Sequence, residues 1–208
     1  HFFGMNLYAV RLPFAIHGVL AVLAIYLLFK ELFYKDKNQE KWALLAAFLL
    51  SISPWHLHYS RLAFESGLAL NLMLWSLYFF FRFVRLEKLP NLLIASLCGV
   101  LAVYAYHSSK VTIPLLFIFL FFKNLNLFKK RMGALILAGG FTLVLLYPFL
   151  KDSFFGAGLT RASSMIFAQG YTALELIKKL ISNTLSYFSL DFLISGKNLG
   201  NYRHGDGK

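Results

Sequence analysis

The stretch SPWHLHYSRLAFES, residues 53–66, gathers two histidines, an arginine and a glutamate in a chain that is otherwise strongly apolar. Apolar runs flank it on both sides, over residues 42–54 and 66–84. A helix that crosses the hydrocarbon core of a bilayer needs about 20 mostly apolar residues. The sequence therefore predicts two membrane helices joined by a polar stretch at one membrane surface.

The same alternation of apolar runs and polar connections continues along the chain, with further apolar segments at residues 12–30, 91–106, 110–122 and 133–150. The segments 42–54 and 110–122 are short for a full crossing and would extend, cross a thinned membrane or sit inside the bundle. All five prolines lie at or near the ends of predicted segments, where helices tolerate them. The predicted fold class is an all-α membrane protein, a polytopic helical bundle with an interfacial amphipathic helix in an outer loop.

Composition supports this class. The chain is 59% hydrophobic and only 14% charged, whereas soluble domains are about 45–50% apolar. In a soluble chain a net charge of +12 would suggest nucleic-acid binding, but here the basic residues cluster in short connections, so no nucleic-acid partner is expected. The single cysteine, Cys98, excludes an internal disulfide and is interpreted as a packing residue.

Basic residues divide unevenly between alternate connections, and short cytoplasmic loops of membrane proteins are enriched in lysine and arginine. The loops 34–41, 85–90 and 123–132 are therefore predicted to face the cytoplasm. With the adjoining helix ends they hold eleven basic residues: Lys30, Lys35, Lys37, Lys41, Arg82, Arg85, Lys88, Lys123, Lys129, Lys130 and Arg131. The alternate connections hold only Arg11, Arg61 and Lys110 and are predicted to face outward, together with the tail. We predict two domains, a transmembrane bundle over 1–150 and a partial outer-face loop over 151–208.

Within the opening stretch, Ser53 and Pro54 are typical of a helix start. From there His58, Arg61 and Glu65 would share one helical face, and Arg61 and Glu65 could pair. The alternative is a membrane-surface belt in which Trp55, His56 and Tyr59 lie at the interface and Arg61 snorkels towards water. The first reading makes the stretch part of a binding site, because charges kept near a bilayer often mark substrate paths.

Two further outward features share this side. The turn YAYHSSK, residues 104–110, puts His107 and Lys110 at the membrane surface, where Lys110 would meet helix carbonyls, lipid headgroups or a substrate phosphate. In the tail, residues 172–193 predict an interfacial amphipathic helix, which starts with a Thr172–Glu175 capping box. Its apolar stripe consists of Leu174, Ile177, Leu180, Ile181, Leu185 and Phe188. A Gly-rich loop with Arg203 and His204 follows, which is either a solvated loop or part of the site.

An anion held at the membrane surface is the natural ligand for such a set of residues. Arginine binds phosphate through two parallel hydrogen bonds, and lysine acts as a point charge. A phosphate joined to a lipid chain would place its head among the polar residues and its tail between helices. The expected contacts are Arg61, Glu65, His107, Lys110, Arg203 and His204, with Arg11 and His58 as further candidates. Two histidines two residues apart without a nearby carboxylate are weak support for a metal site.

Four motifs carry a resemblance to a known family: RLPFAIHGVLAVLAIYLLFKELF (11–33), ISPWHLHYSRLAFES (52–66), GVLAVYAYHSSKVTIPLL (99–116) and YFSLDFLISGKNLGNYRHGDGK (187–208). In this order they resemble multi-spanning glycosyltransferases of the GT-C type that use polyprenyl-phosphate sugars. The relatives are bacterial members related to dolichyl-phosphate-mannose protein mannosyltransferases and to lipid A aminoarabinose transferases. The resemblance covers essentially the whole chain.

The resemblance implies an inverting enzyme that moves a sugar from a polyprenyl-phosphate carrier to a protein, lipid or glycan acceptor on the outer, periplasmic or extracellular face. It implies a bacterial inner or plasma membrane. The family's catalytic carboxylate lies in a loop after the first span, which would be upstream of His1, so the chain would be an internal fragment and its catalytic residue is unknown. Arg61 and Glu65 match a family position that borders the active-site cavity. Lys110 matches a position usually held by a basic residue after a Tyr-rich turn, and Arg203 and His204 match the ending of the family's outer loop. No cofactor is firmly implied, and because members of the wider family differ in metal dependence, a divalent metal stays open.

The main alternative is a transporter or flippase of a lipid-linked or anionic solute. Transporters usually place polar groups near the bilayer midplane, whereas here only His17 and Asn71 interrupt the apolar segments, and both are interpreted as packing residues. A non-catalytic membrane scaffold is the third alternative. Clustering of polar residues at one surface favours chemistry at that surface.

Overall fold

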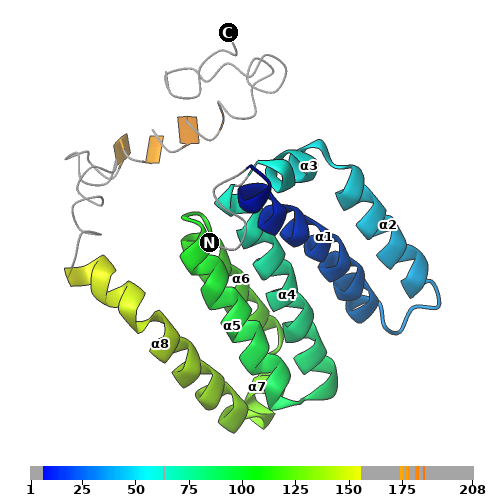
Figure 1. Ribbon diagram of the computed structural model, residues 1–208. Helices are drawn as coiled ribbons and strands as arrows, with labels where there is room; N and C mark the ends of the chain where they lie inside the picture. Colours follow the sequence, from blue (N-terminus) through cyan, green and yellow to red (C-terminus); the bar gives the residue numbers. More distant parts are fainter. Residues whose placement is uncertain are drawn as a thin grey trace. The chain divides into compact units, whose positions relative to one another are not determined.

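The computed structural model describes residues 7–62, 64–155 and, within the tail, 174, 175, 177, 178, 181, 182 and 185, and most of these residues are in helices (Figure 1). The helices up to residue 155 are α1 (Leu7–Leu32), α2 (Gln39–Ile52), α3 (Pro54–Arg61), α4 (Glu65–Leu86), α5 (Leu89–Ala105), α6 (Ser109–Lys123), α7 (Leu125–Lys130) and α8 (Met132–Phe155). The chain divides into two compact units, His1–Phe149 and Leu150–Lys208. The contacts described below lie within the first unit.

The predicted fold class is confirmed, since each predicted apolar segment largely coincides with one helix. Within the described residues, three helical segments have the length and composition to cross a membrane: Arg11–Leu32, Glu65–Leu86 and Met132–Asp152. Helices α2, α5 and α6 have 14, 17 and 15 residues. At about 1.5 Å per residue they rise roughly 21–26 Å, which is less than the ~30 Å hydrocarbon core.

The prolines correct one expectation. Pro54 and Pro90 occupy the first turns of α3 and α5, as predicted. However, Pro13, Pro114 and Pro148 lie inside α1, α6 and α8. The helices extend past the apolar runs used to predict them, which places these prolines several residues from a helix end. Membrane helices tolerate such prolines because neighbouring groups and local adjustments satisfy the freed carbonyls.

Helix α4 is the centre of the first unit and packs against α1 on one side and α5 on the other. Small residues allow α4 and α5 to approach closely. The fully buried hydroxyl of Ser76 donates a 2.6 Å hydrogen bond to the carbonyl of Ala95. A Cβ on Gly99 would lie 3.2 Å from the same Ser76 Oγ. Further along α4, Phe80 packs edge-on against Phe117 of α6, with 5.5 Å between ring centroids.

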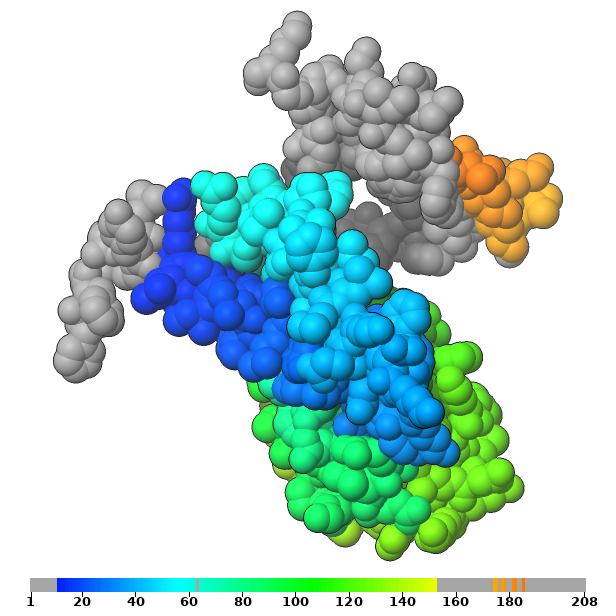
Figure 2. All heavy atoms as spheres, turned by 90° about the vertical axis from the view of Figure 1, so that its right-hand side faces the viewer, coloured from blue at the N-terminus to red at the C-terminus, as the bar shows by residue number. Residues whose placement is uncertain are grey.

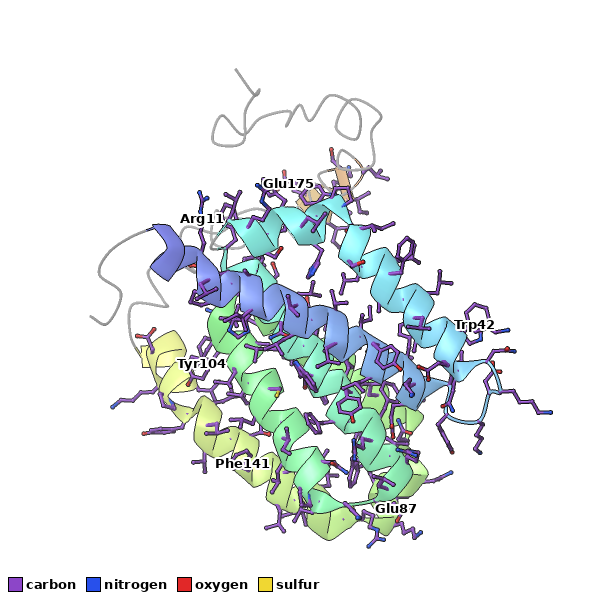
Figure 3. All side chains as sticks on the ribbon, turned by 45° about the vertical axis from the view of Figure 1, so that its right-hand side comes forward. Arg11, Trp42, Glu87, Tyr104, Phe141 and Glu175 are labelled. Carbon is purple, nitrogen blue, oxygen red and sulfur yellow. The ribbon has the colours of Figure 1, made fainter. Side chains whose placement is uncertain are left out.

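The connections lie at two opposite ends of the bundle (Figure 1). We call the "α3 end" the one that holds α3, the start of α4 and the turn between α5 and α6. The "α7 end" holds α7, the α1–α2 loop and the turn between α4 and α5. Figure 3 shows Arg11 beside α3 and Glu87 at the opposite end. The basic loops at 34–41, 85–90 and 123–132 thus lie together, apart from 54–65 and 107–110, while their cytoplasmic orientation stays a prediction.

Ion pairs fix the helices at the α7 end. Arg85 of α4 donates two hydrogen bonds to Glu31 of α1, at 2.5 and 3.0 Å, and Glu31 is only 8% exposed. Glu87 caps α4 in the left-handed region, with φ 54°. Its hydrogen bonds from Arg131, 2.7 Å, and Lys130, 3.3 Å, lower its pKa below the ordinary 4.5. This pairing therefore stabilises the folded protein above about pH 4.5 and is lost as the pH falls below it.

The predicted tail helix lies largely outside the described residues, Thr172, Leu180 and Phe188 included. Its described members Leu174, Ile177, Ile181 and Leu185 are helical and exposed. These four residues agree with a helix over this segment.

The pair between Arg85 and Glu31 predicts unequal effects of removing its two members. Arg85→Met leaves the buried carboxylate of Glu31 without a counter-charge and should destabilise the protein by roughly 2–3 kcal/mol. Glu31→Gln leaves Arg85 within reach of water, because its side chain is 37% exposed. This variant should therefore lower the free energy of unfolding by only about 1 kcal/mol. Thermal unfolding in detergent measures both. The double variant should unfold at a higher temperature than Arg85→Met alone, and a larger loss for Glu31→Gln than for Arg85→Met would contradict this account.

Candidate anion-binding site

Helix α3 lies across the start of α1 because the chain breaks on both sides of it. Ser53, before the first turn, is extended, with ψ 121°, and Pro54 follows at the first helical position. Leu62, after the last turn, is again extended, with ψ 107°. Figure 2 shows the cyan α3 against the dark blue start of α1. The predicted helix start at Ser53 and Pro54 is confirmed, although the Ser53 side chain makes no capping hydrogen bond.

A close contact positions α3 on α1. The Nε2 atom of His56 lies 3.2 Å from the carbonyl oxygen of Gly18. A Cβ built on Gly18 would lie only 2.6 Å from the Cβ of Ser60, so only glycine fits at this point of α1. His56 was also considered as a member of a membrane-surface belt; its ring contacts the backbone of the neighbouring helix α1, and its position at the membrane surface stays a prediction. In the sequence, the close packing of the two helices is indicated only by the glycine at position 18, inside an apolar run.

A pocket of about 420 Å³ opens where α3 crosses α1, and Arg11, His58 and Arg61 contribute its polar lining. Pro54, Leu57 and Leu62 form the rest of its wall. A second hollow beside it, of about 410 Å³, shares Arg11 and Arg61. Within the described part of the chain neither arginine has a carboxylate partner. Two unneutralised guanidinium groups in one hollow favour an anionic ligand, above all a phosphate.

The predicted helical face of His58, Arg61 and Glu65 is wrong. Helix α3 ends at Arg61, and α4 begins separately at Glu65 after an extended segment at Leu62 and Phe64. The spacing that would align them holds only inside one continuous helix. No ion pair joins Arg61 to Glu65 among the described residues, and Glu65 does not line the pocket. The break leaves Arg61 with Arg11 and separates it from the acidic residue.

The aromatic residues of the same stretch form a cluster of their own. Tyr59 stacks on Trp55, with 5.9 Å between ring centroids, and meets Phe64 edge-on at 5.5 Å. Trp55 is 70% exposed, which is typical of a side chain at a membrane–water interface. The belt interpretation therefore fits Trp55 and Tyr59, whereas His58 and Arg61 line the pocket.

Lys110 and His107 lie at the same end of the bundle but in a different place. They belong to the turn between α5 and α6 and the start of α6, and neither lines the arginine pocket. The half-buried Lys110 holds its Nζ 4.7 Å from the centre of the Phe149 ring of α8. Tyr104 packs edge-on against the same ring and donates a 2.9 Å hydrogen bond to the carbonyl of Leu145. These contacts fix the α3 end of α8 to the α5–α6 pair.

An apolar cavity of about 270 Å³ lies between α5, α6 and α8. Its lining is almost entirely hydrocarbon and includes Val103, Ile113, Phe117 and Leu146. Ile113 and Leu146 each lie one helical turn from a member of the Lys110–Phe149 contact, so this contact borders the cavity. The cavity could not be predicted from the sequence, because it depends on how three helices pack.

His17 and Asn71 meet across α1 and α4, where Asn71 Nδ2 lies 2.9 Å from His17 Nδ1. Asn71 is 2% exposed, and its Oδ1 has no partner. Their predicted role as packing residues agrees with this contact, although the sequence did not show that they bind each other.

The remaining site predictions lie beyond what the structure describes. Arg203 and His204 fall outside the described residues, so their place in the site stays a prediction. Among the described residues, no group of three or more His, Cys, Asp or Glu side chains could hold a metal ion. The His56 ring contacts the Gly18 carbonyl and does not join His58 in the pocket.

The comparison with known families finds a match over most of the chain. The family model described as dolichyl-phosphate-mannose-protein mannosyltransferase matches residues 1–151, which include α1 to α7 and almost all of α8. No curated protein and no solved structure matches the chain significantly. The matched range includes Arg11, His58 and Arg61 and the residues around the apolar cavity.

The contact between Gly18 and Ser60 predicts a specific rescue. Gly18→Ala should destabilise the protein by about 1–3 kcal/mol, because the new methyl group overpacks α3 against α1. Adding Ser60→Gly removes the opposing Cβ and should restore part of the unfolding temperature, whereas Ser60→Ala keeps that Cβ and should not.

Gly139→Ala is the matched control, since nothing lies within 4 Å of a Cβ at that position of α8. This variant should leave the unfolding temperature unchanged or raise it, because alanine favours helix. Equal losses for Gly18→Ala and Gly139→Ala would show that no close contact exists at Gly18.

Proposed function

This chain belongs to the dolichyl-phosphate-mannose-protein mannosyltransferase family and is a membrane glycosyltransferase of the GT-C type, and from that premise we propose its donor and its site. The donor is a sugar linked to a polyprenyl phosphate, and transfer takes place at the α3 end of the bundle, on the outer face of the membrane. The acceptor is a hydroxyl or amine group. The family's name supports a protein acceptor, while a lipid or a glycan would use the same donor site.

The arginine pocket is the observation that carries this proposal. Arg11 and Arg61 come from different helices, converge on one hollow and lack carboxylate partners in the described chain. Guanidinium groups bind phosphate oxygens bidentately. The pocket lies at the bundle end where the helices begin or finish, which suits a headgroup at a membrane surface.

The chemistry assigns these arginines to the leaving group. A base takes the proton of the acceptor, and the acceptor attacks the anomeric carbon from the face opposite the phosphate, which inverts that carbon. The bond between the anomeric carbon and the phosphate oxygen breaks, and its electron pair stays on that oxygen. The phosphate gains one negative charge, which Arg11 and Arg61 stabilise. The base that the family resemblance implies is a carboxylate.

The apolar cavity between α5, α6 and α8 suits the first part of the lipid chain. Its hydrocarbon lining offers a polyprenyl chain the same environment as the lipid core. Lys110 borders it at the α3 end, and its charge has no carboxylate partner among the described residues. The donor would thus hold its phosphate at the α3 end between the arginine pocket and Lys110, with its chain between the helices.

Arg61→Gln tests the donor phosphate site. The variant should lower the rate of sugar transfer about 10²–10³-fold, by analogy with the loss of one preorganised charge stabiliser. The measurement uses the intact protein in detergent, a radiolabelled polyprenyl-phosphate hexose and membrane extract as acceptor. Arg61→Lys keeps the charge but loses the bidentate geometry, so its rate should lie between those of wild type and Arg61→Gln.

Arg131→Gln is the matched control, because it removes one arginine charge at the α7 end while Glu87 keeps Lys130 as a partner. It should transfer sugar at nearly the wild-type rate. If Arg61→Gln folds and transfers as fast as Arg131→Gln, the arginine pocket does not bind the donor. If the wild type transfers none of several hexoses or pentoses, the proposed donor class is wrong.

Thr142→Phe tests the lipid-chain cavity. Thr142 lines the cavity, so a phenyl ring there should raise the KM for a long-chain polyprenyl donor several-fold and affect a short-chain donor little. Leu143→Phe adds a ring on the exposed side of α8 and should change neither KM. A similar rise for both donors with Thr142→Phe would indicate a general packing defect and contradict the assignment.

A further inference from the structure

The α7 end of the bundle combines a charge imbalance with exposed aromatic side chains, and neither feature takes part in the proposed transfer. Four carboxylates lie there, and each is bound within the protein. Glu31 pairs with Arg85, Glu40 with Lys30, and Glu87 with Lys130 and Arg131. Asp36 accepts hydrogen bonds from the backbone of Asn38 and the indole of Trp42.

The lysines at this end are left without such partners. Six exposed lysines make no ion pair within the described part of the chain: Lys35, Lys37, Lys41, Lys88, Lys123 and Lys129. They come from three connections that are distant in sequence: the loop and helix start after α1, the turn after α4, and the region from α6 to α7. Every carboxylate that the structure describes at this end is already bound, so the charge of these lysines is left for a partner outside the described residues.

Exposed apolar and aromatic groups lie beside these lysines. Tyr34 and Trp42 are each 44% exposed, and Phe122, next to Lys123, is 63% exposed. The Lys35 Nζ lies 5.5 Å from the centre of the Tyr34 ring. Aromatic rings next to lysines are typical of the boundary between lipid chains and headgroups.

We propose that the six exposed lysines of the α7 end bind the headgroups of anionic phospholipids in the surrounding bilayer. The aromatic side chains insert at the level of the acyl-chain boundary, and the lysines contact the phosphates above them. An anionic lipid satisfies both features at once, since it supplies negative charge and a hydrocarbon boundary in the same place. This inference stands apart from the proposed function, because it concerns the opposite end of the bundle and needs no donor or acceptor.

The test measures lipid selectivity in nanodiscs with the intact protein. Spin-labelled phosphatidylglycerol and phosphatidylcholine are compared by electron spin resonance, which reports the fraction of each lipid immobilised on the protein. We expect wild-type protein to favour phosphatidylglycerol several-fold. This preference should fall in 0.5 M NaCl, where the Debye length shrinks to about 4 Å.

The variant Lys35→Gln/Lys88→Gln/Lys129→Gln removes one lysine from each of the three connections. It should reduce the preference by about threefold, because it removes half of the six lysines whose attraction to anionic headgroups adds up at this end. Lys151→Gln, an exposed lysine in the C-terminal part of α8, is the matched control and should keep the wild-type preference. Equal immobilisation of both lipids by the wild-type protein would overturn the proposal. A soluble polyanion would then be the better candidate for the partner of these lysines. An unchanged preference in the triple variant would overturn it as well.

Discussion

Backbone hydrogen bonding is the constraint on which the rest of this structure depends. In hydrocarbon every N–H and C=O must find a partner within the protein, so a chain of this composition becomes helical wherever it lies in the membrane. Irregular backbone is confined to the ends of the bundle, where water or headgroups can satisfy it. The breaks around Ser53 and Leu62 lie at such an end. They turn α3 across α1 and bring Arg61 next to Arg11, so the candidate site is a consequence of where the helices are allowed to stop.

The two ends of the bundle use charge in opposite ways. At the α7 end each described carboxylate is bound by a basic residue or by hydrogen bonds, and the pair between the buried Glu31 and Arg85 fixes α1 against α4. At the α3 end Arg11 and Arg61 share a pocket in which no described carboxylate neutralises them. Two like charges that line one hollow repel each other, and a bound anion would relieve that repulsion.

The sequence predicted the fold well and the site only in part, for physical reasons. Hydropathy locates helices because the hydrocarbon core acts on many residues together, and each of the six predicted segments largely coincides with one helix. The end of α3 was missed because one break between Arg61 and Glu65 changes the side-chain geometry without changing the composition. Contacts such as His56 with Gly18, or His17 with Asn71, join residues far apart in the sequence. No periodicity within a single helix contains that information.

The same reasoning explains why Lys110 was predicted in the site yet lies apart from the arginines. Sequence places His58, Arg61, His107 and Lys110 at one membrane surface, but a surface has two dimensions, and hydropathy reports only depth. The position of Lys110 along that surface is set by the Phe149 ring and by the hydrogen bond from Tyr104 to Leu145. An amphiphilic donor would bind both features, because its phosphate requires basic groups and its lipid chain requires an apolar environment such as the α5–α6–α8 cavity. A charged site and a separate apolar cavity therefore suit the two parts of one donor molecule.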